Sequence, residues 1–241
     1  MQFSRAIPRV LCLAVSLVAS ATPQPTQVVR WSAGQPGCAF EAADDGSYRY
    51  ALATDEFSVV LAMDAQELDK ARRRAEPILG LFLNVRFLKQ NPPALDPGKI
   101  SLEFIRHFHT KEAPLDRVVL AAGLEADDKK TAQMAARQVS RHPEKKEEIE
   151  AALKAQQENT SQMIAWARAK GLQPASLQSG ESSGWLLFAV RTRWIGELNR
   201  QEEFMLRIPL GRIVVEFPFT LPPSQDDLRL RTRSTDQTGN P

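Results

Sequence analysis

The chain has 241 residues, of which 43% are hydrophobic, and this proportion is typical of a globular protein with a buried core. It carries 31 Lys and Arg against 29 Asp and Glu, so its net charge is only +2. A nucleic-acid-binding protein needs a surplus of cations to displace the counterions of the phosphates, so this balance argues against nucleic acid as a partner.

The first 21 residues have the features of a secretory signal peptide. Arg5 and Arg9 precede a short apolar run, and Ala19-Ser20-Ala21 matches a signal-peptidase cleavage site. We therefore predict that residues 1–21 are removed and that the protein is exported to the periplasm or the extracellular space; an uncut leader acting as an anchor is the alternative. No later segment approaches the roughly 18 consecutive apolar residues of a membrane-spanning helix, so we predict no integral membrane segment after cleavage.

Residues 22–27 are predicted to be a linker, after which apolar residues alternate with period two. This alternation predicts strands at 38–42, 48–52, 57–63, 79–87 and 100–104. The first two should form a hairpin, because the Asp45-Gly46 dipeptide between them favours a tight turn.

The pattern becomes helical from Asp127 to Gly171. Ala132, Ala135 and Val139 recur at helical spacing, and Pro143 suits the first turn of a second helix. We predict an αα-hairpin, with helices at 126–141 and 143–170, whose second helix lies partly in solvent.

Strands are predicted again at 185–190, 204–208 and 213–219. Pro218 has no N–H to donate, so the far end of its strand should lie at a sheet edge. Residues 224–241 are polar and charged, and we predict that they are disordered.

The order of these elements predicts a mainly β, α+β fold in one domain. Strands on both sides of a single helical block favour an antiparallel β-sandwich over 28–223 that carries the helical hairpin at 126–171. The strand order resembles that of small Ig-like modules in exported bacterial proteins. The alternative is a β domain to about residue 110 followed by a separate α+β domain.

His107 and His109 are the first candidates for a functional site. Histidines two positions apart are found in some metal sites, and Glu112 is a conceivable third ligand. Alternation instead places both histidines on the polar face of a strand and Phe104 and Phe108 on the core face. We favour this second interpretation, which predicts two exposed histidines at a strand end.

Other motifs of catalysis or cofactor binding are absent from the sequence. It contains no G-x-S-x-G, H-E-x-x-H or C-x-x-C motif and no glycine-rich phosphate loop, so we predict no catalytic residue and no cofactor. Asp64, Glu67 and Asp69 are neighbouring carboxylates, and we interpret them as a solvated turn or short helix.

Three more residues are candidates for contacts outside the chain. Cys38 is the only cysteine that remains after leader cleavage; we favour a buried inert thiol, with an intermolecular disulfide as the alternative. Trp166 and Trp194 are candidate partner-binding residues, and packing against the strands is the favoured alternative for Trp166.

The sequence favours a non-enzymatic exported module of the cell envelope that binds an unidentified protein partner through the hairpin or a sheet edge. One alternative is a metal-dependent hydrolase or small-ligand binder centred on His107 and His109. Another is a periplasmic chaperone or assembly factor that adds a partner strand to an exposed sheet edge.

Overall fold

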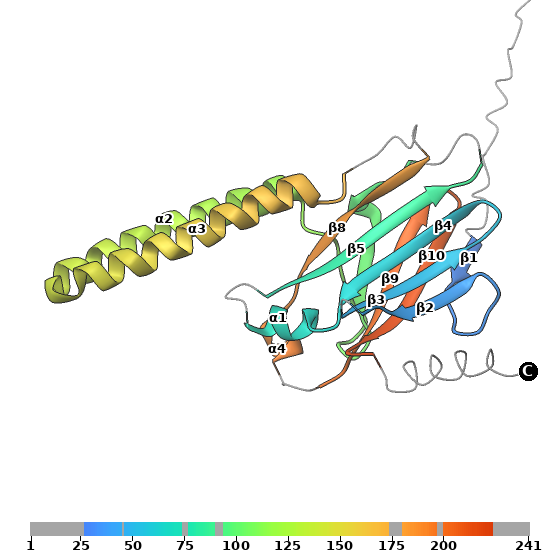
Figure 1. The fold of residues 1–241 in the computed structure, drawn as a ribbon, viewed down its shortest axis with the longest axis horizontal. Coiled ribbons are helices and arrows are strands. Elements are labelled where there is room, and N and C mark those ends of the chain that lie inside the picture. Colours follow the sequence, from blue (N-terminus) through green and yellow to red (C-terminus); the bar gives the residue numbers. More distant parts are fainter. Residues whose placement is uncertain are drawn as a thin grey trace, which may run out of the picture.

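The computed structural model describes residues 27–44, 46–73, 77–89, 94–173, 180–196 and 200–223. The predicted signal peptide, the linker up to residue 26 and the predicted disordered tail lie outside the described residues. The described chain has a mixed α+β fold with two five-stranded sheets and four α-helices (Figure 1).

One sheet has the order β2–β3–β4–β5–β8 and is antiparallel throughout. The first four strands follow one another in the chain, and β8 joins β5 after the helices. β2 and β3 form the predicted hairpin, in which Gly46 has a φ of 78° that glycine adopts easily. The strands are β2 (Cys38–Ala42), β3 (Ser47–Ala53), β4 (Phe57–Asp64), β5 (Ile78–Phe87) and β8 (Glu181–Ala189).

The other sheet has the order β1–β10–β9–β6–β7. Its strands are β1 (Gln27–Arg30), β6 (Ser101–Phe104), β7 (Thr110–Glu112), β9 (Glu202–Leu210) and β10 (Ile213–Leu221). β1 runs parallel to β10 and pairs with it only as far as Glu216, whereas the other pairs are antiparallel. Pro218 therefore lies where the outer edge of β10 is unpaired within the described residues, as predicted.

The two sheets enclose one core. Phe57, Val59, Leu61 and Met63 of β4 are at most 1% exposed, as their alternation predicts. Strands before and after the helices contribute to the same buried cluster. Because β5 pairs with β8 and β6 with β9, the two flanks of the helical insertion also share both sheets.

The predicted Ig-like arrangement is not confirmed. In an Ig constant-type domain the chain crosses to the second sheet after two strands, whereas β2 to β5 remain neighbours in one sheet here. The spacing of strands and turns, on which the prediction depended, says little about which sheet each strand joins.

The predicted helical hairpin is present between β7 and β8, but it begins earlier than expected. It consists of α2 (Arg117–Arg141), the 3₁₀ turn η2 (Pro143–Lys145) and α3 (Lys146–Lys170). The Asp116 side chain accepts hydrogen bonds from the Val118 and Val119 amides, at 2.8 and 3.0 Å, and so starts α2 ahead of position 126. We call residues 117–170 the arm.

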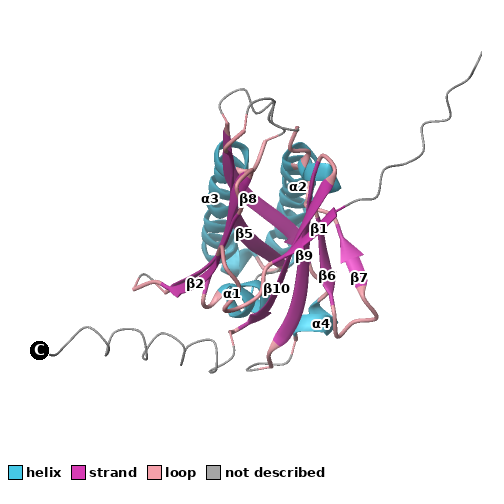
Figure 2. Ribbon diagram, turned by 90° about the vertical axis from the view of Figure 1, so that its right-hand side faces the viewer, coloured by secondary structure: helices cyan, strands magenta, loops and turns pink. Residues whose placement is uncertain are grey.

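The arm projects away from the sheets (Figure 1). At 1.5 Å per residue, two 25-residue helices extend it by about 37 Å. Two short helices, α1 (Glu67–Arg73) and α4 (Thr192–Ile195), lie together at one end of the sheets (Figures 1 and 2). None of the described helices combines the length and apolar character needed to cross a bilayer.

Candidate functional site

The two histidines of the predicted metal site lie in the turn between β6 and β7, but they contact different carboxylates. His107 Nε2 is 3.1 Å from Glu202 Oε2, and His109 Nδ1 is 2.6 Å from Glu103 Oε1. Glu112 lies in β7, in register with Leu102. In the part of the chain that the structure describes, no group of three His, Cys, Asp or Glu side chains is arranged to hold a metal ion.

The turn itself has an unusual backbone. Phe108 and His109 have φ values of 55° and 54°, in the left-handed region, and the Thr110 amide donates to the His107 carbonyl at 3.1 Å. Two such residues in succession are the mark of a type I′ turn, which usually contains Asn and Gly. Phe108 is 100% exposed, so its predicted place in the core is wrong. The strand ends at Phe104, and beyond it side chains no longer alternate between the two faces of the sheet.

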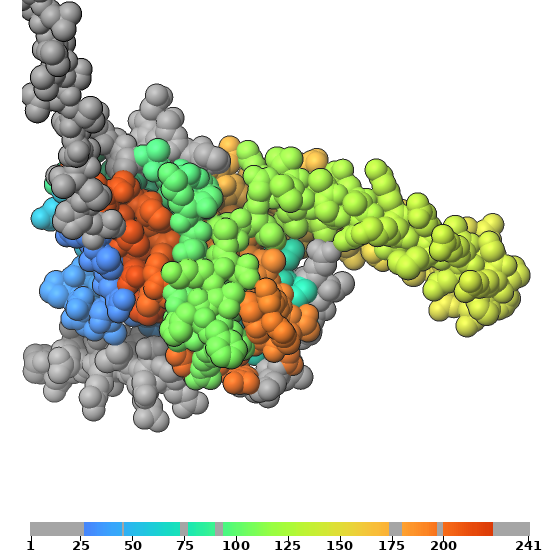
Figure 3. Space-filling view, turned by 180° about the vertical axis from the view of Figure 1, so that it is seen from behind, coloured from blue at the N-terminus to red at the C-terminus, as the bar shows by residue number. Residues whose placement is uncertain are grey.

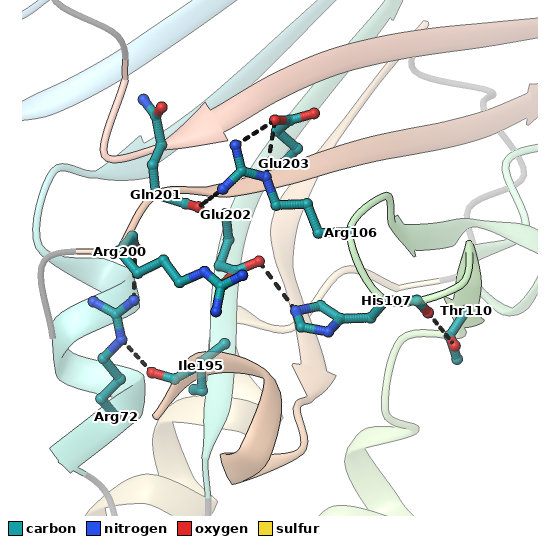
Figure 4. A network of polar contacts seen from close by, with 9 residues as sticks. All are labelled: Arg72, Arg106, His107, Thr110, Ile195, Arg200, Gln201, Glu202 and Glu203. Atoms are coloured by element: carbon teal, nitrogen blue, oxygen red, sulfur yellow. Dashed lines mark hydrogen bonds and ion pairs between the residues drawn. The ribbon is translucent and has the colours of Figure 1, made fainter. Parts of the chain in front are cut away.

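Glu202, at the start of β9, is a buried carboxylate that the turn covers (Figure 4). Its side chain is 2% exposed, and its Oε1 has no hydrogen-bond partner within the described residues. Arg200 Nε is 3.9 Å from that oxygen. The His107 ring bonds the other oxygen and stacks on Trp194, with centroids 5.4 Å apart. The imidazole thus covers a buried carboxyl group and is only 16% exposed, so the prediction of two exposed histidines is wrong for His107.

Arginines fasten the surrounding segments to one another (Figure 4). Arg106 bonds Glu203 at 2.7 and 2.9 Å and donates to the Gln201 carbonyl at 3.0 Å. Arg72 of α1 donates to the carbonyls of Ile195 and Arg200. Three residues of the β6–β7 turn, at positions 106, 107 and 109, therefore each bond a carboxylate, which fixes the strained turn in place.

Glu103 also belongs to a row of alternating charges across the outer face of its sheet. Arg30 of β1 bonds Glu216 of β10 at 2.7 Å, Arg207 of β9 bonds Glu216 at 2.9 Å, and Arg207 also bonds Glu103 of β6. We call these four residues the charge ladder. The Glu103 and Glu216 side chains are only 6% and 7% exposed, although they point away from the core.

The charge ladder keeps its carboxylates ionised. Burial, the largest single influence, disfavours the charged form of Glu103, but the hydrogen bonds and charges of Arg207 and His109 outweigh it and lower its pKa below 4.5. Burial likewise opposes ionisation of Glu216, and Arg30 and Arg207 together lower its pKa. Burial disfavours the Arg207 cation, yet its two carboxylate partners raise its pKa.

Both candidate tryptophans pack within the chain. Trp166 joins a small apolar cluster at the base of the arm and lies 5.5 Å from Trp185, centroid to centroid. Trp194 is 9% exposed, lies 5.0 Å from the Phe104 ring, and has the Arg191 guanidinium 4.8 Å from its own ring. Both tryptophans therefore help to hold elements together within the chain.

The base of the arm is attached to the edge of β8 at both ends. The Leu115 amide donates to the Leu187 carbonyl at 2.7 Å, and the Leu172 amide donates to the Trp185 carbonyl at 2.9 Å. Gly184 permits this contact, because a Cβ there would lie 2.6 Å from the Leu172 Cα.

Further out, the two helices of the arm leave a groove between them. The groove encloses about 650 Å³ near the tip, and Met134 on its wall is 55% exposed. Polar pairs separate this distal part from the base: Thr160 donates to Asp128 at 3.0 Å, and Gln156 donates to Thr131 at 3.4 Å. Both apolar and polar side chains line the groove, among them Ala135, Gln138, Ile149 and Leu153.

The remaining candidates lie apart from these sites. Cys38 is a free, half-buried thiol packed against the core at the edge strand β2. Glu67 and Asp69 lie in a short helix, α1, which is one of the two predicted forms, but Glu67 is not solvated: it is 6% exposed and accepts a hydrogen bond from the Gly80 amide at 2.8 Å. Asp64 and Asp69 form ion pairs with Lys70 and Arg72, at 2.6 and 2.7 Å.

Sequence reasoning missed Glu202 and the charge ladder. Alternation carried a signal for the first, because Glu202 has the same parity as the core residues Phe204 and Leu206. No local sequence pattern predicts that its hydrogen-bond partner is His107, which is 95 positions away in the chain. Comparison with known proteins adds no further guide, since no family model, no curated protein and no solved structure matches this chain.

Proposed function

We propose that this chain is an exported, non-enzymatic module of the cell envelope, built on a β-sandwich scaffold, whose arm binds another protein. The observation that carries the proposal is the arm itself. Among the described residues it bonds the sheets only at its base, and Leu120, Ala121, Ala135, Ile164 and Ala167 are the only ones buried along its two helices. A helical pair that merely covered a sheet would bury a continuous apolar face against it.

The groove near the tip supports the same proposal. It places half-buried apolar side chains beside the exposed Met134, where a partner helix or extended segment could contact both α2 and α3. Methionine adapts its shape to different partners, which makes it common at binding surfaces.

The histidines support a structural role over a catalytic one. His107 and His109 both bond buried carboxylates that hold the β6–β7 turn in place. Within the described residues, no hydroxyl or thiol hydrogen-bonds to the His107 ring, so the geometry offers no activated nucleophile.

Site-specific photocrosslinking tests the proposal. A photoreactive residue at Gln138 or Ala152, which line the groove, should give one discrete protein adduct in envelope preparations of the source cells. The same residue at Lys99, on the body of the protein, is the control. The proposal fails if the groove positions give no discrete adduct, or if the control position gives the same one.

A shortened arm provides a second test. Deleting residues 131–156 and joining the helices by a short glycine-rich turn keeps the apolar cluster at the base and the Asp128–Thr160 bond. We expect this variant to fold with a nearly unchanged unfolding midpoint and to lose the crosslinked partner. Unfolding of the variant would instead show that the distal arm is part of the folded core.

The open edge of β2 favours strand addition as a second candidate function. Gly37 and Ala43 bond β3, so by alternation the main-chain groups of Phe40 and Ala42 point away from the sheet. If a partner strand adds there, hydrogen exchange at the Phe40 and Ala42 amides should slow in its presence. Unchanged exchange with the crosslinked partner bound would exclude this mode of binding.

A further inference from the structure

Phe108 occupies a position in the β6–β7 turn where a phenylalanine destabilises the fold. A left-handed φ costs a phenylalanine free energy that glycine or asparagine would avoid, and its ring is 100% exposed to water. Nothing that the side chain contacts within the described chain offsets these costs. The position would be more stable with Asn or Gly, so the benefit of an aromatic side chain there does not come from the described part of the fold.

The turn holds Phe108 outward. Arg106, His107 and His109 are bonded to Glu203, Glu202 and Glu103, and two of these carboxylates are buried in the body of the protein. The apex therefore cannot fold back to bury the ring without breaking ion pairs and hydrogen bonds on both of its sides. The turn therefore keeps the aromatic ring of Phe108 exposed in a fixed position.

Unpaired cations lie around this apex. Lys111 of β7 and Arg191 and Arg193 at α4 are exposed, and none has a carboxylate partner within the described residues. Arg191 lies over Trp194, whose ring stacks on His107, so α4 and the turn adjoin. Seen from behind, the green β6–β7 turn and the orange α4 segment lie side by side on the lower part of the body (Figure 3).

We propose that Phe108, Lys111, Arg191 and Arg193 form a membrane-contact surface, which we call the Phe108 surface. Phe108 enters the interfacial layer of a bilayer, and the three cations contact the phosphates of anionic lipids. A protein partner would need a pocket that fits the protruding ring, whereas a fluid bilayer can accept the ring without one. The cations come from two elements, β7 and α4, and a fluid bilayer can offer each of them its own mobile headgroup.

Vesicle cosedimentation tests the proposal. The full exported chain, without residues 1–21, is mixed with vesicles of phosphatidylcholine alone or with about 30 mol% phosphatidylglycerol, a composition chosen to raise the surface charge. We expect binding only to the anionic vesicles, weakened by salt. Phe108→Asn should lower the affinity by about tenfold to a hundredfold, the value of burying one aromatic side chain, while its unfolding midpoint rises.

Charge reversal separates the two contributions. The double variant Lys111→Glu, Arg193→Glu should lose both affinity and salt dependence. Two controls alter exposed residues elsewhere: Leu88→Asn, which removes an apolar side chain that is 55% exposed, and Lys129→Glu on the arm. Both controls should bind like the unaltered protein.

Three results would overturn the proposal. One is no association with anionic vesicles at millimolar lipid; another is Phe108→Asn binding as well as the unaltered protein. The third is loss of the arm-crosslinked partner in Phe108→Asn with vesicle binding unchanged, which would assign the apex to a protein. The shortened arm should leave vesicle binding intact, so this proposal and the proposed function can fail independently.

Discussion

Replacing Arg207 with methionine removes the cation that two carboxylates of the charge ladder share, while much of its apolar stem is kept. Removing one partner of a fully buried ion pair costs about 3–5 kcal/mol. Arg207 is 25% exposed, Glu216 keeps Arg30, and Glu103 keeps His109. We therefore expect the free energy of unfolding at pH 7 to fall by about 2–3 kcal/mol.

The effect should depend on pH in a defined direction. The folded protein lowers the pKa of Glu103 and of Glu216 below 4.5, their value in the unfolded chain. Their ionised forms therefore stabilise the fold above that value, and this stability is lost as the pH falls through the folded pKa values. The difference between Arg207→Met and the unaltered protein should be largest above about pH 5 and should shrink below about pH 4.

Urea denaturation, followed by tryptophan fluorescence and circular dichroism at several pH values, measures this difference. Arg106→Met is the matched control, because the Arg106–Glu203 pair has a similar 2.7 Å separation but side chains that are 39% and 40% exposed. Such a pair contributes less than about 1 kcal/mol. The reasoning is refuted if Arg207→Met costs no more than this control, or if its cost is the same in acid as at neutral pH.

Three further predictions concern the arm and the β6–β7 turn. Gly184→Ala would place a Cβ 2.6 Å from the Leu172 Cα, so it should lower the free energy of unfolding, measured by urea denaturation, by about 1–3 kcal/mol. Gly123→Ala meets open space in α2 and should instead raise this free energy by about 0.5–1 kcal/mol. Phe108→Asn should raise the free energy of unfolding by about 1 kcal/mol, and a loss of stability would show that the ring has a structural partner. Asp116→Ala should speed hydrogen exchange of the first amides of α2, because the Asp116 side chain accepts bonds from them and its pKa is lowered by those bonds; unchanged exchange would contradict this capping role.

Alternation predicted eight of the ten described strands, because these strands turn one face to the shared core, but it missed the short strands β1 and β7. In β4, Phe57, Val59, Leu61 and Met63 are buried while the residues between them are half-buried. In β9, Phe204, Leu206 and Ile208 are buried as alternation predicts, although Met205 between them is buried as well. A period of two follows from strand geometry alone, so a strand can be predicted without knowing which strands are its neighbours.

The turn and the charged residues could not be predicted in the same way. The β6–β7 turn contains Phe108 and His109 where Asn and Gly would be the usual signal, so alternation was extended past the end of the strand. The Arg30–Glu216 and Arg207–Glu103 bonds join residues 186 and 104 positions apart, and only the order of strands in the sheet brings them together.

The parallel pairing of β1 with β10 has a consequence for how this chain is made. Translation delivers β1 long before β10, so its four residues have no sheet to join until almost all the described strands have been synthesised. Most of the other sheet faces no such delay, because β2 to β5 follow one another in the chain and are antiparallel neighbours. Folding should therefore begin with β2 to β5 and end with the pairing of β1 and β10. In a chain that stops before residue 213, β1 would have no strand to pair with.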